Sequence, residues 1–302
     1  MKRTIDMRFI CLMVCLSIFA AWTFPQNRSS FTIEGHRGAR GYSPENTIPS
    51  FILAIDQGAD TLELDVVVTR DNKLLVSHEP WFSSVISLDP NGQRIPKEKE
   101  REHNIFKMTY SETTRYDVGR IGNAGFPEQR PVKIAKPLLT DVFKSVEKYT
   151  SSKKLPVVRY NIEIKSHSQG DDSFHPVPSV FAKLLLEDVS KFKLQDRVII
   201  QSFDVRPLQE IKRTNGNIPL ALLVNNPEGV GANLAKLGFI PDTYSPHFSL
   251  VDAALVKYCR ENGMKIVPWT VNDVADLERM RTFDLDGIIT DYPDRAVKVF
   301  RK

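Results

Sequence analysis

Short apolar runs alternate with amphipathic segments along most of the chain. Within residues 46–59, Ile48, Phe51, Ile52 and Ile55 recur at helical spacing, which predicts a helix with one buried face. Six later segments are also predicted to be helices: 138–149, 177–192, 206–214, 229–238, 250–263 and 274–283. Nine short runs are predicted to be strands: 31–36, 61–69, 74–79, 160–166, 197–203, 219–225, 242–246, 265–271 and 285–293.

A strand followed by a helix, repeated to the end of the chain, is typical of an α/β fold with a parallel sheet and right-handed crossovers. Nine predicted strands are one more than a barrel of eight strands needs. Either the hairpin-like pair joined by residues 70–73 or the short run 242–246 is therefore expected to lie outside such a barrel.

The interval from Pro80 to Pro137 interrupts this rhythm. It contains the stretches PNGQR, KEKEREH and GRIGNAGFPEQR and has little periodic apolar content. A long segment of this kind is typical of a lid or a capping element. We therefore predict an insertion over about residues 80–137, with its charge run exposed to solvent.

The first 22 residues have the pattern of a signal peptide. Lys2, Arg3 and Arg8 precede a largely apolar run of 14 residues that ends near Ala20 and Ala21. We expect an exported protein, located in the periplasm, with its folded part in residues 31–302. An uncleaved N-terminal anchor or a lipid anchor is the alternative, although the run is short for a membrane span.

Removal of this segment changes the charge and the cysteine count. Three basic residues and Asp6 are lost, so the formal net charge falls from +4 to +2. Such a balanced chain gives no reason to expect a nucleic-acid partner, and we expect no stable membrane insertion of the mature chain. Cys259 is the only cysteine that remains, which excludes an internal disulfide and is typical of a buried small residue.

Two carboxylates lie two positions apart on one predicted strand. Glu63 and Asp65 point to one face, and Leu62 and Leu64 point to the other. Two buried carboxylates repel each other unless a cation lies between them, and hard oxygen ligands favour Ca²⁺ or Mg²⁺. The alternative is an outward-facing pair at a twisted edge.

A second strand repeats the pattern with Glu163 and Lys165. The two residues could form an ion pair between strands. Glu163 would also be a third carboxylate at the carboxyl end of a strand, where barrels of this class have their sites. Lys165 would then be available to hold an anion.

Two histidines also lie at strand ends. His78 ends one strand, and His36 ends another beside Arg37. A single histidine in such a place is more often structural, but two can divide the roles of base and acid. The spacing of Gly35, Gly38 and Gly41 fits neither the dinucleotide fingerprint nor a P-loop, and we interpret these glycines as room for close approach of a ligand.

Together these residues suit displacement at an anionic phosphorus centre with one hard cation. A G-x-S-x-G elbow, which would indicate an esterase or a protease, is absent from the sequence.

The stretch EGHRGARGYSPENTIPSFILAIDQGADTLELDVVVTRDNKLLVSHE resembles the opening of the glycerophosphodiester phosphodiesterases. The likeness continues through NIEIKS, VIIQSF, PWTVN and DGIITDYP, so it covers the mature chain. It implies a (β/α)₈ TIM barrel of the phosphoinositide-phospholipase-C-like kind, with a small inserted subdomain after the third strand. The family usually has Asp after the second histidine, whereas this chain has Glu79.

The resemblance also implies a role for each candidate residue. Glu63, Asp65 and Glu163 match the metal ligands, His36 and His78 match the acid–base pair, and Arg37 and Lys165 match the phosphate contacts. Trp269 matches an aromatic position near the glycerol, with packing as the alternative, and Gln201 is a further candidate on position alone.

The function implied is metal-dependent hydrolysis of glycerophosphodiesters to sn-glycerol 3-phosphate and an alcohol. The alternatives are a lipid-active phosphodiesterase of the phospholipase D or C type, and a binding protein that captures phosphate esters without turnover.

Overall fold

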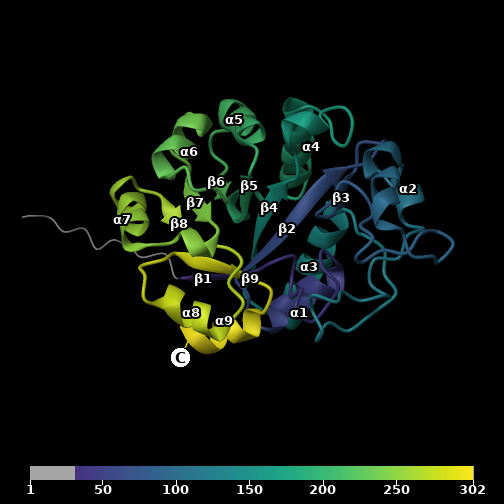
Figure 1. Ribbon diagram of the computed structural model, residues 1–302, viewed down its shortest axis with the longest axis horizontal. Coiled ribbons are helices and arrows are strands. Elements are labelled where there is room, and N and C mark those ends of the chain that lie inside the picture. Colours follow the sequence, from purple (N-terminus) through teal and green to yellow (C-terminus); the bar gives the residue numbers. More distant parts are fainter. Residues whose placement is uncertain (1–30, 302) are drawn as a thin grey trace, which may run out of the picture. The chain divides into compact units, whose positions relative to one another are not determined.

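The computed structural model describes residues 31–301, and the predicted signal peptide lies outside them. Its sheet has eight parallel strands in the order β8-β7-β6-β5-β4-β2-β1-β9, with helices around the outside of the strands (Figure 1). The parallel strands are β1 (Thr32–Gly35), β2 (Thr61–Val68), β4 (Arg159–Ile164), β5 (Val198–Ser202), β6 (Leu220–Val224), β7 (Thr243–Pro246), β8 (Lys265–Ile266) and β9 (Gly287–Thr290).

Backbone hydrogen bonds connect the two ends of this sheet. The N–H of Asp286 donates to the carbonyl of Ile266 at 3.1 Å, and the N–H of Ile289 donates to the carbonyl of Pro268 at 2.9 Å. The N–H of Val271 donates in turn to the carbonyl of Ile289. The predicted (β/α)₈ barrel is therefore confirmed.

The predicted strand that exceeds the eight of the barrel is the run 74–79, which forms β3 (Leu74–Val76) of a hairpin. Strand β3 pairs antiparallel with the end of β2, and Asn72 takes a left-handed conformation in the turn between them. Strand β7, which corresponds to the short predicted run 242–246, pairs parallel with β6 and β8 and so belongs to the barrel. Of the two alternatives, it is therefore one strand of the hairpin, β3, that lies outside the barrel.

The helices follow the strands in the predicted order. They are α1 (Ile48–Asp56), α2 (Tyr110–Thr113), α3 (Leu139–Lys153), α4 (Pro178–Lys191), α5 (Val205–Thr214), α6 (Val230–Leu237), α7 (Ala253–Glu261), α8 (Val274–Arg281) and α9 (Pro293–Phe300). Two helices were not predicted from the sequence: α2, which lies between β3 and α3, and α9, which buries Ala296 and Val299. Within residues 31–301, every helix is too short or too polar to cross a membrane.

Short 3-10 turns complete the chain between these elements. They are Lys97–Glu102, Ile105–Lys107, Ser168–Gly170, Gln195–Arg197 and Phe248–Leu250.

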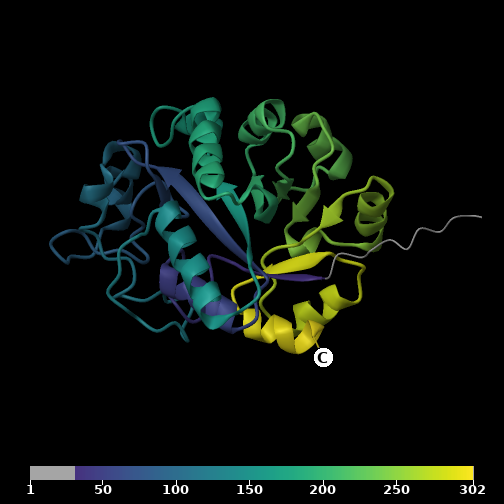
Figure 2. The same cartoon turned by 180° about the vertical axis from the view of Figure 1, so that it is seen from behind.

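The segment between β3 and α3 contains the predicted insertion and packs on the outside of the hairpin. Val67 of β2 and Leu75 of β3 form a hydrophobic cluster with Phe82, Tyr116 and other residues of the segment. The rings of Phe82 and Tyr116 stack with centroids 3.7 Å apart. In Figures 1 and 2 this part (blue) lies at one edge of the barrel. This segment thus packs against β2 and β3 through a hydrophobic cluster separate from the main core.

Candidate active site

Three carboxylates meet near the carboxyl ends of two neighbouring strands. Glu63 and Asp65 lie on β2, and Glu163 on β4 pairs in register with Asp65. Each of the three side chains offers an oxygen within 4.8 Å of the other two, and all are buried. This arrangement excludes the outward-facing alternative for Glu63 and Asp65.

The charges of this cluster call for a cation. Burial, followed by the charges of Asp65 and Glu163, raises the pKa of Glu63 well above its usual value. Burial likewise raises the pKa of Glu163 to about 7. Burial opposes ionisation of Asp65, but the charges of Arg37, His78 and Lys165 and the hydrogen bond from Asn46 together lower its pKa, so it stays ionised. Among residues 31–301 its buried Oδ1 has no hydrogen-bond partner. These oxygen donors fit a hard divalent cation.

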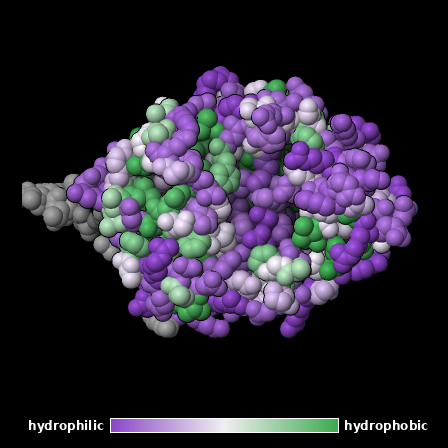
Figure 3. Space-filling model, viewed as in Figure 1, coloured by the Kyte–Doolittle hydropathy of each residue, from purple (hydrophilic) through white to green (hydrophobic). Residues whose placement is uncertain are grey.

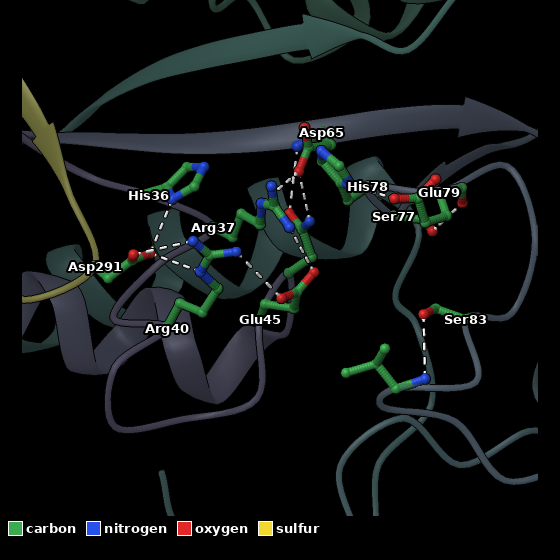
Figure 4. Close-up of polar contacts among 12 residues, drawn as sticks. His36, Arg37, Arg40, Glu45, Asp65, Ser77, His78, Glu79, Ser83 and Asp291 are labelled. Carbon is green, nitrogen blue, oxygen red and sulfur yellow. Dashed lines mark hydrogen bonds and ion pairs between the residues drawn. The ribbon is translucent and has the colours of Figure 1, made fainter. Parts of the chain in front are cut away.

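His36 is held by a carboxylate that directly follows the last strand. Nδ1 of its ring lies 2.8 Å from Oδ1 of Asp291, as Figure 4 shows. Nδ2 of Asn272 donates to the other oxygen of Asp291 at 2.7 Å. Burial, and then the charge of Arg40, lowers the pKa of His36 to about 4. The ring is therefore neutral at pH 7, with its proton on Nδ1 and a free electron pair on Nε2.

His78 has a similar arrangement. Its Nδ1 lies 2.8 Å from Oε1 of Glu79, the next residue (Figure 4). Burial, and then the charge of Arg37, lowers the pKa of His78. The His78 side chain is 30% exposed, against 12% for His36, so it has the freer access to water.

Arg37 and Lys165 border the acidic cluster on two sides. The backbone N–H of Arg37 donates to Oε2 of Glu63 at 2.9 Å, and its guanidinium Nε lies 3.3 Å from Oδ2 of Asp65. Nζ of Lys165 donates to Oε1 of Glu163 at 2.7 Å and lies 3.7 Å from Oδ1 of Asp65. Glu163 and Lys165 thus pair with each other at the end of β4, and Lys165 also reaches Asp65 on the neighbouring strand. The ion-pair alternative and a place in the acidic cluster are therefore both realised.

The two remaining candidates line the same cavity, whose volume is about 180 Å³. Nε2 of Gln201 donates to Oε1 of Glu63 at 2.9 Å, so Gln201 orients a carboxylate of the cluster. The indole N–H of Trp269 donates to the carbonyl of Ser245 at 2.9 Å, and its ring packs edge-to-face against Phe203. The structure therefore brings all nine predicted residues into one region. On the face shown in Figure 3, a hollow is surrounded mainly by hydrophilic residues.

The glycines after β1 have a different role from the one we expected. A Cβ on Gly38, which has φ +88°, would lie 2.5 Å from Oγ of Ser50, and a Cβ on Gly41 would lie 2.1 Å from the ring of Tyr292. These positions are filled by the protein itself. The interpretation of the glycines as room for a ligand is wrong at both positions, because glycine there allows the loop to pack on α1 and on the end of β9.

Several functional side chains were not singled out from the sequence. Asn46 donates from Nδ2 to Oδ2 of Asp65 at 2.8 Å, and Glu45 accepts from Arg37 at 2.8 Å. Both lie in the Pro-Glu-Asn-Thr run of residues 44–47, inside the stretch that carries the family resemblance. Asp291 follows the last strand at the carboxyl edge of the barrel, so the rule that sites lie at this edge was a signal that could have found it.

Comparison with known proteins agrees with this geometry. Residues 36–295 match the model of the glycerophosphoryl diester phosphodiesterase family. The chain belongs to this family of enzymes. A glycerophosphodiester phosphodiesterase of Caldanaerobacter subterraneus subsp. tengcongensis is 31% identical to it over 273 residues, which cover 88% of this chain and 96% of the relative. The family resemblance seen in the sequence is thus confirmed.

Solved structures of glycerophosphodiester phosphodiesterases share the fold. A proposed family member from Silicibacter pomeroyi DSS-3 has a TM-score of 0.80 and 29% identity, over 90% of this chain and 94% of that chain. A phosphodiesterase of Oleispira antarctica, solved with the product sn-glycerol-3-phosphate, has a TM-score of 0.71 and 21% identity over 90% of this chain and 97% of that chain.

Proposed function

We propose that the chain hydrolyses glycerophosphodiesters to sn-glycerol 3-phosphate and an alcohol, with one divalent cation, Ca²⁺ or Mg²⁺. The observation that carries the proposal is that His36 and His78 line one cavity together with Glu63 and Glu163 of the acidic cluster. Family membership supports the reaction, and the product seen in the Oleispira antarctica phosphodiesterase supports the glycerol phosphate end.

Glu63, Asp65 and Glu163 would hold the cation, which supplies positive charge to the phosphoryl oxygens. Arg37 and Lys165 lie beside the cluster and bind the same oxygens, Arg37 through its planar fork and Lys165 as a point charge. These residues orient the phosphodiester between the two imidazoles.

We assign the base to His36 and the acid to His78. Asp291 keeps the proton of His36 on Nδ1, so Nε2 accepts the proton of the attacking hydroxyl. His78 is the more exposed of the two and can take a proton from water, which it then gives to the leaving alkoxide. Glu79 stabilises the imidazolium in this step.

The attacking hydroxyl can belong to water or to the neighbouring carbon of the glycerol. Attack by the glycerol hydroxyl forms a cyclic phosphate, which water then opens. A glycerophosphodiester without this hydroxyl distinguishes the two routes, because direct attack by water still cleaves it.

The test of the proposed function is release of glycerol 3-phosphate from glycerophosphocholine and glycerophosphoethanolamine. We expect turnover with Ca²⁺ or Mg²⁺ and its loss with a chelator. Absence of turnover at saturating cation would overturn the proposal and favour a binding protein. Lysophosphatidylcholine is included as a substrate, because a mouse lysophospholipase D is 25% identical to the chain over 303 residues.

We also propose that residues 1–22 direct export to the periplasm. The basic start and the apolar run support this proposal. N-terminal sequencing of the protein from a periplasmic fraction tests it, and an intact Met1 would contradict cleavage.

A further inference from the structure

Arg40 connects two carboxylates that hold different residues of the site. Its Nε donates to Oδ1 of Asp291 at 2.7 Å, and a terminal nitrogen donates to Oδ2 at 3.0 Å. Another terminal nitrogen lies 3.6 Å from Oε2 of Glu45. Asp291 is the partner of His36, and Glu45 is the partner of Arg37. The guanidinium of Arg40 therefore contacts the partners of both His36 and Arg37, the two residues after β1 (Figure 4).

Arg40 is itself held by the segment between β3 and α3. Its guanidinium carbon lies 4.5 Å from the centroid of the Phe126 ring, which is a cation–π contact. The side-chain amide of Gln129 donates to the carbonyl of Arg40 at 2.8 Å. The Arg40 side chain is 16% exposed. The insertion therefore fixes the position of this guanidinium, which lines the cavity beside His36.

The charged groups that act on His36 come from two elements. Asp291, after β9, favours the imidazolium, whereas Arg40 and Arg37, in the loop between β1 and α1, oppose it. Arg40 acts in two ways: its charge repels the imidazolium, and its two bonds to Asp291 share the carboxylate with His36. Burial of His36 acts in the same direction as Arg40.

We propose that Arg40 is a positioning residue: by holding both oxygens of Asp291, it orients the imidazole of His36 with Nε2 directed to the cavity and limits the stabilisation that Asp291 can give to the imidazolium. Together with the burial of His36, Arg40 thereby sets the lower pH limit of the reaction. This inference rests on the proposed function, since it assigns His36 the role of base.

Two variants of Arg40 test the inference. Arg40→Met removes the charge and the fork, and Arg40→Lys keeps the charge alone. We expect the acidic limb of kcat/KM for glycerophosphocholine to move to higher pH by roughly one unit in Arg40→Met and by less in Arg40→Lys. Arg295→Met is the matched control, because Arg295 pairs with Glu128 at the surface and we expect it to keep the wild-type limb.

A second measurement is independent of turnover. The imidazole of His36 is titrated by NMR in the metal-free protein, and its pKa is expected to rise in Arg40→Met. Unchanged titration and an unchanged limb in folded Arg40→Met and Arg40→Lys would overturn the role of Arg40. If the wild type does not hydrolyse the substrate but the pKa of His36 still rises in Arg40→Met, the proposed function is rejected. The effect of Arg40 on His36 is supported in that case.

Discussion

Oε1 of Glu79 lies 2.8 Å from Nδ1 of His78, the residue directly before it in the chain. The family resemblance leads one to expect Asp at this position. The structure shows that the longer side chain reaches back to the ring, so His78 has a carboxylate partner as His36 has in Asp291. Glu79 can therefore orient the imidazole in place of Asp.

The Glu79 carboxylate is expected to matter for rate more than for binding. We predict that Glu79→Gln lowers kcat by roughly 10- to 100-fold with a small change in KM, because the imidazolium loses its counter-charge. Glu79→Asp should lose less. Steady-state kinetics measure both, with Glu112→Gln, an exposed residue of helix α2, as control. A wild-type kcat for Glu79→Gln would show that the contact has no catalytic role.

Each histidine of the pair should be required. We predict that His36→Ala and His78→Ala each lose about 10²- to 10⁴-fold in kcat while they still bind the cation in calorimetric titrations, because neither ring belongs to the acidic cluster. His103→Ala, which removes a bond to the hydroxyl of Tyr116, is the control. If either site variant keeps a near-normal rate, the paired mechanism is wrong.

Cation binding should release protons near neutral pH. The pKa of Glu163 is raised to about 7 and that of Glu63 is also raised, so a cation must displace protons from the metal-free cluster. We predict an affinity that falls by roughly tenfold or more between pH 8 and pH 6. Calorimetry at pH 7 in buffers of different ionisation enthalpy measures the protons released, and a value of zero would contradict the prediction.

Removal of the ligands themselves should abolish this binding. Glu63→Gln and Glu163→Gln are each expected to weaken the affinity for Ca²⁺ or Mg²⁺ by at least about tenfold, since each removes one charged oxygen donor. Glu187→Gln, at an exposed position of α4, should bind as the wild type does.

Lys136 is a buried cation that the proposed reaction does not use. It is 5% exposed and its Nζ lies 5.9 Å from the centroid of the Phe82 ring. Burial lowers its pKa from 10.5 to about 8 despite the neighbouring carboxylates of Glu45 and Glu79. The folded protein therefore holds this proton less tightly than the unfolded chain does.

The sign of the resulting effect on stability follows from linkage. Between pH 8 and about 10.5 the unfolded chain binds more protons at this position, so the free energy of unfolding rises with pH through this window. We predict that Lys136→Met is more stable than the wild type at pH 7 by at most about 3 kcal/mol. Urea unfolding at pH 7 and pH 10 measures the difference, which should shrink at the higher pH. A less stable variant at pH 7 would contradict the prediction.

Local sequence pattern predicted a parallel α/β sheet and several residues of the candidate site, and the family resemblance added the closed barrel and the roles of the residues. The alternation of Glu63 and Asp65 with leucines identified a face of a strand, and a two-residue period is a property of any strand. Glu163 repeated that pattern, and the rule that barrel sites lie at the carboxyl edge brought the two strands together. Helix α1 was equally readable, because its apolar residues face the barrel.

What the sequence did not show depends on contacts between distant segments. Asp291 meets His36 across 255 residues. Its place after a strand makes it a candidate for the site, but no local pattern indicates that His36 is its partner. Arg40 was not singled out from the sequence, because its partners Asp291 and Phe126 come from distant segments of the chain. A local sequence pattern identifies which face of a strand or helix is buried. The contacts of Asp291 and Arg40 are instead formed when the first and last strands of the barrel come together.

The pairing of the first strand with the last has a consequence for biosynthesis. Strand β1 pairs with β2 on one side and with β9 on the other. A chain that has been synthesised only through β4 already contains all three carboxylates of the acidic cluster, but it lacks the partner of His36. All the proposed cation ligands are thus synthesised before the residue that orients His36. A nascent or truncated chain without β9 is expected to be inactive until the barrel is complete.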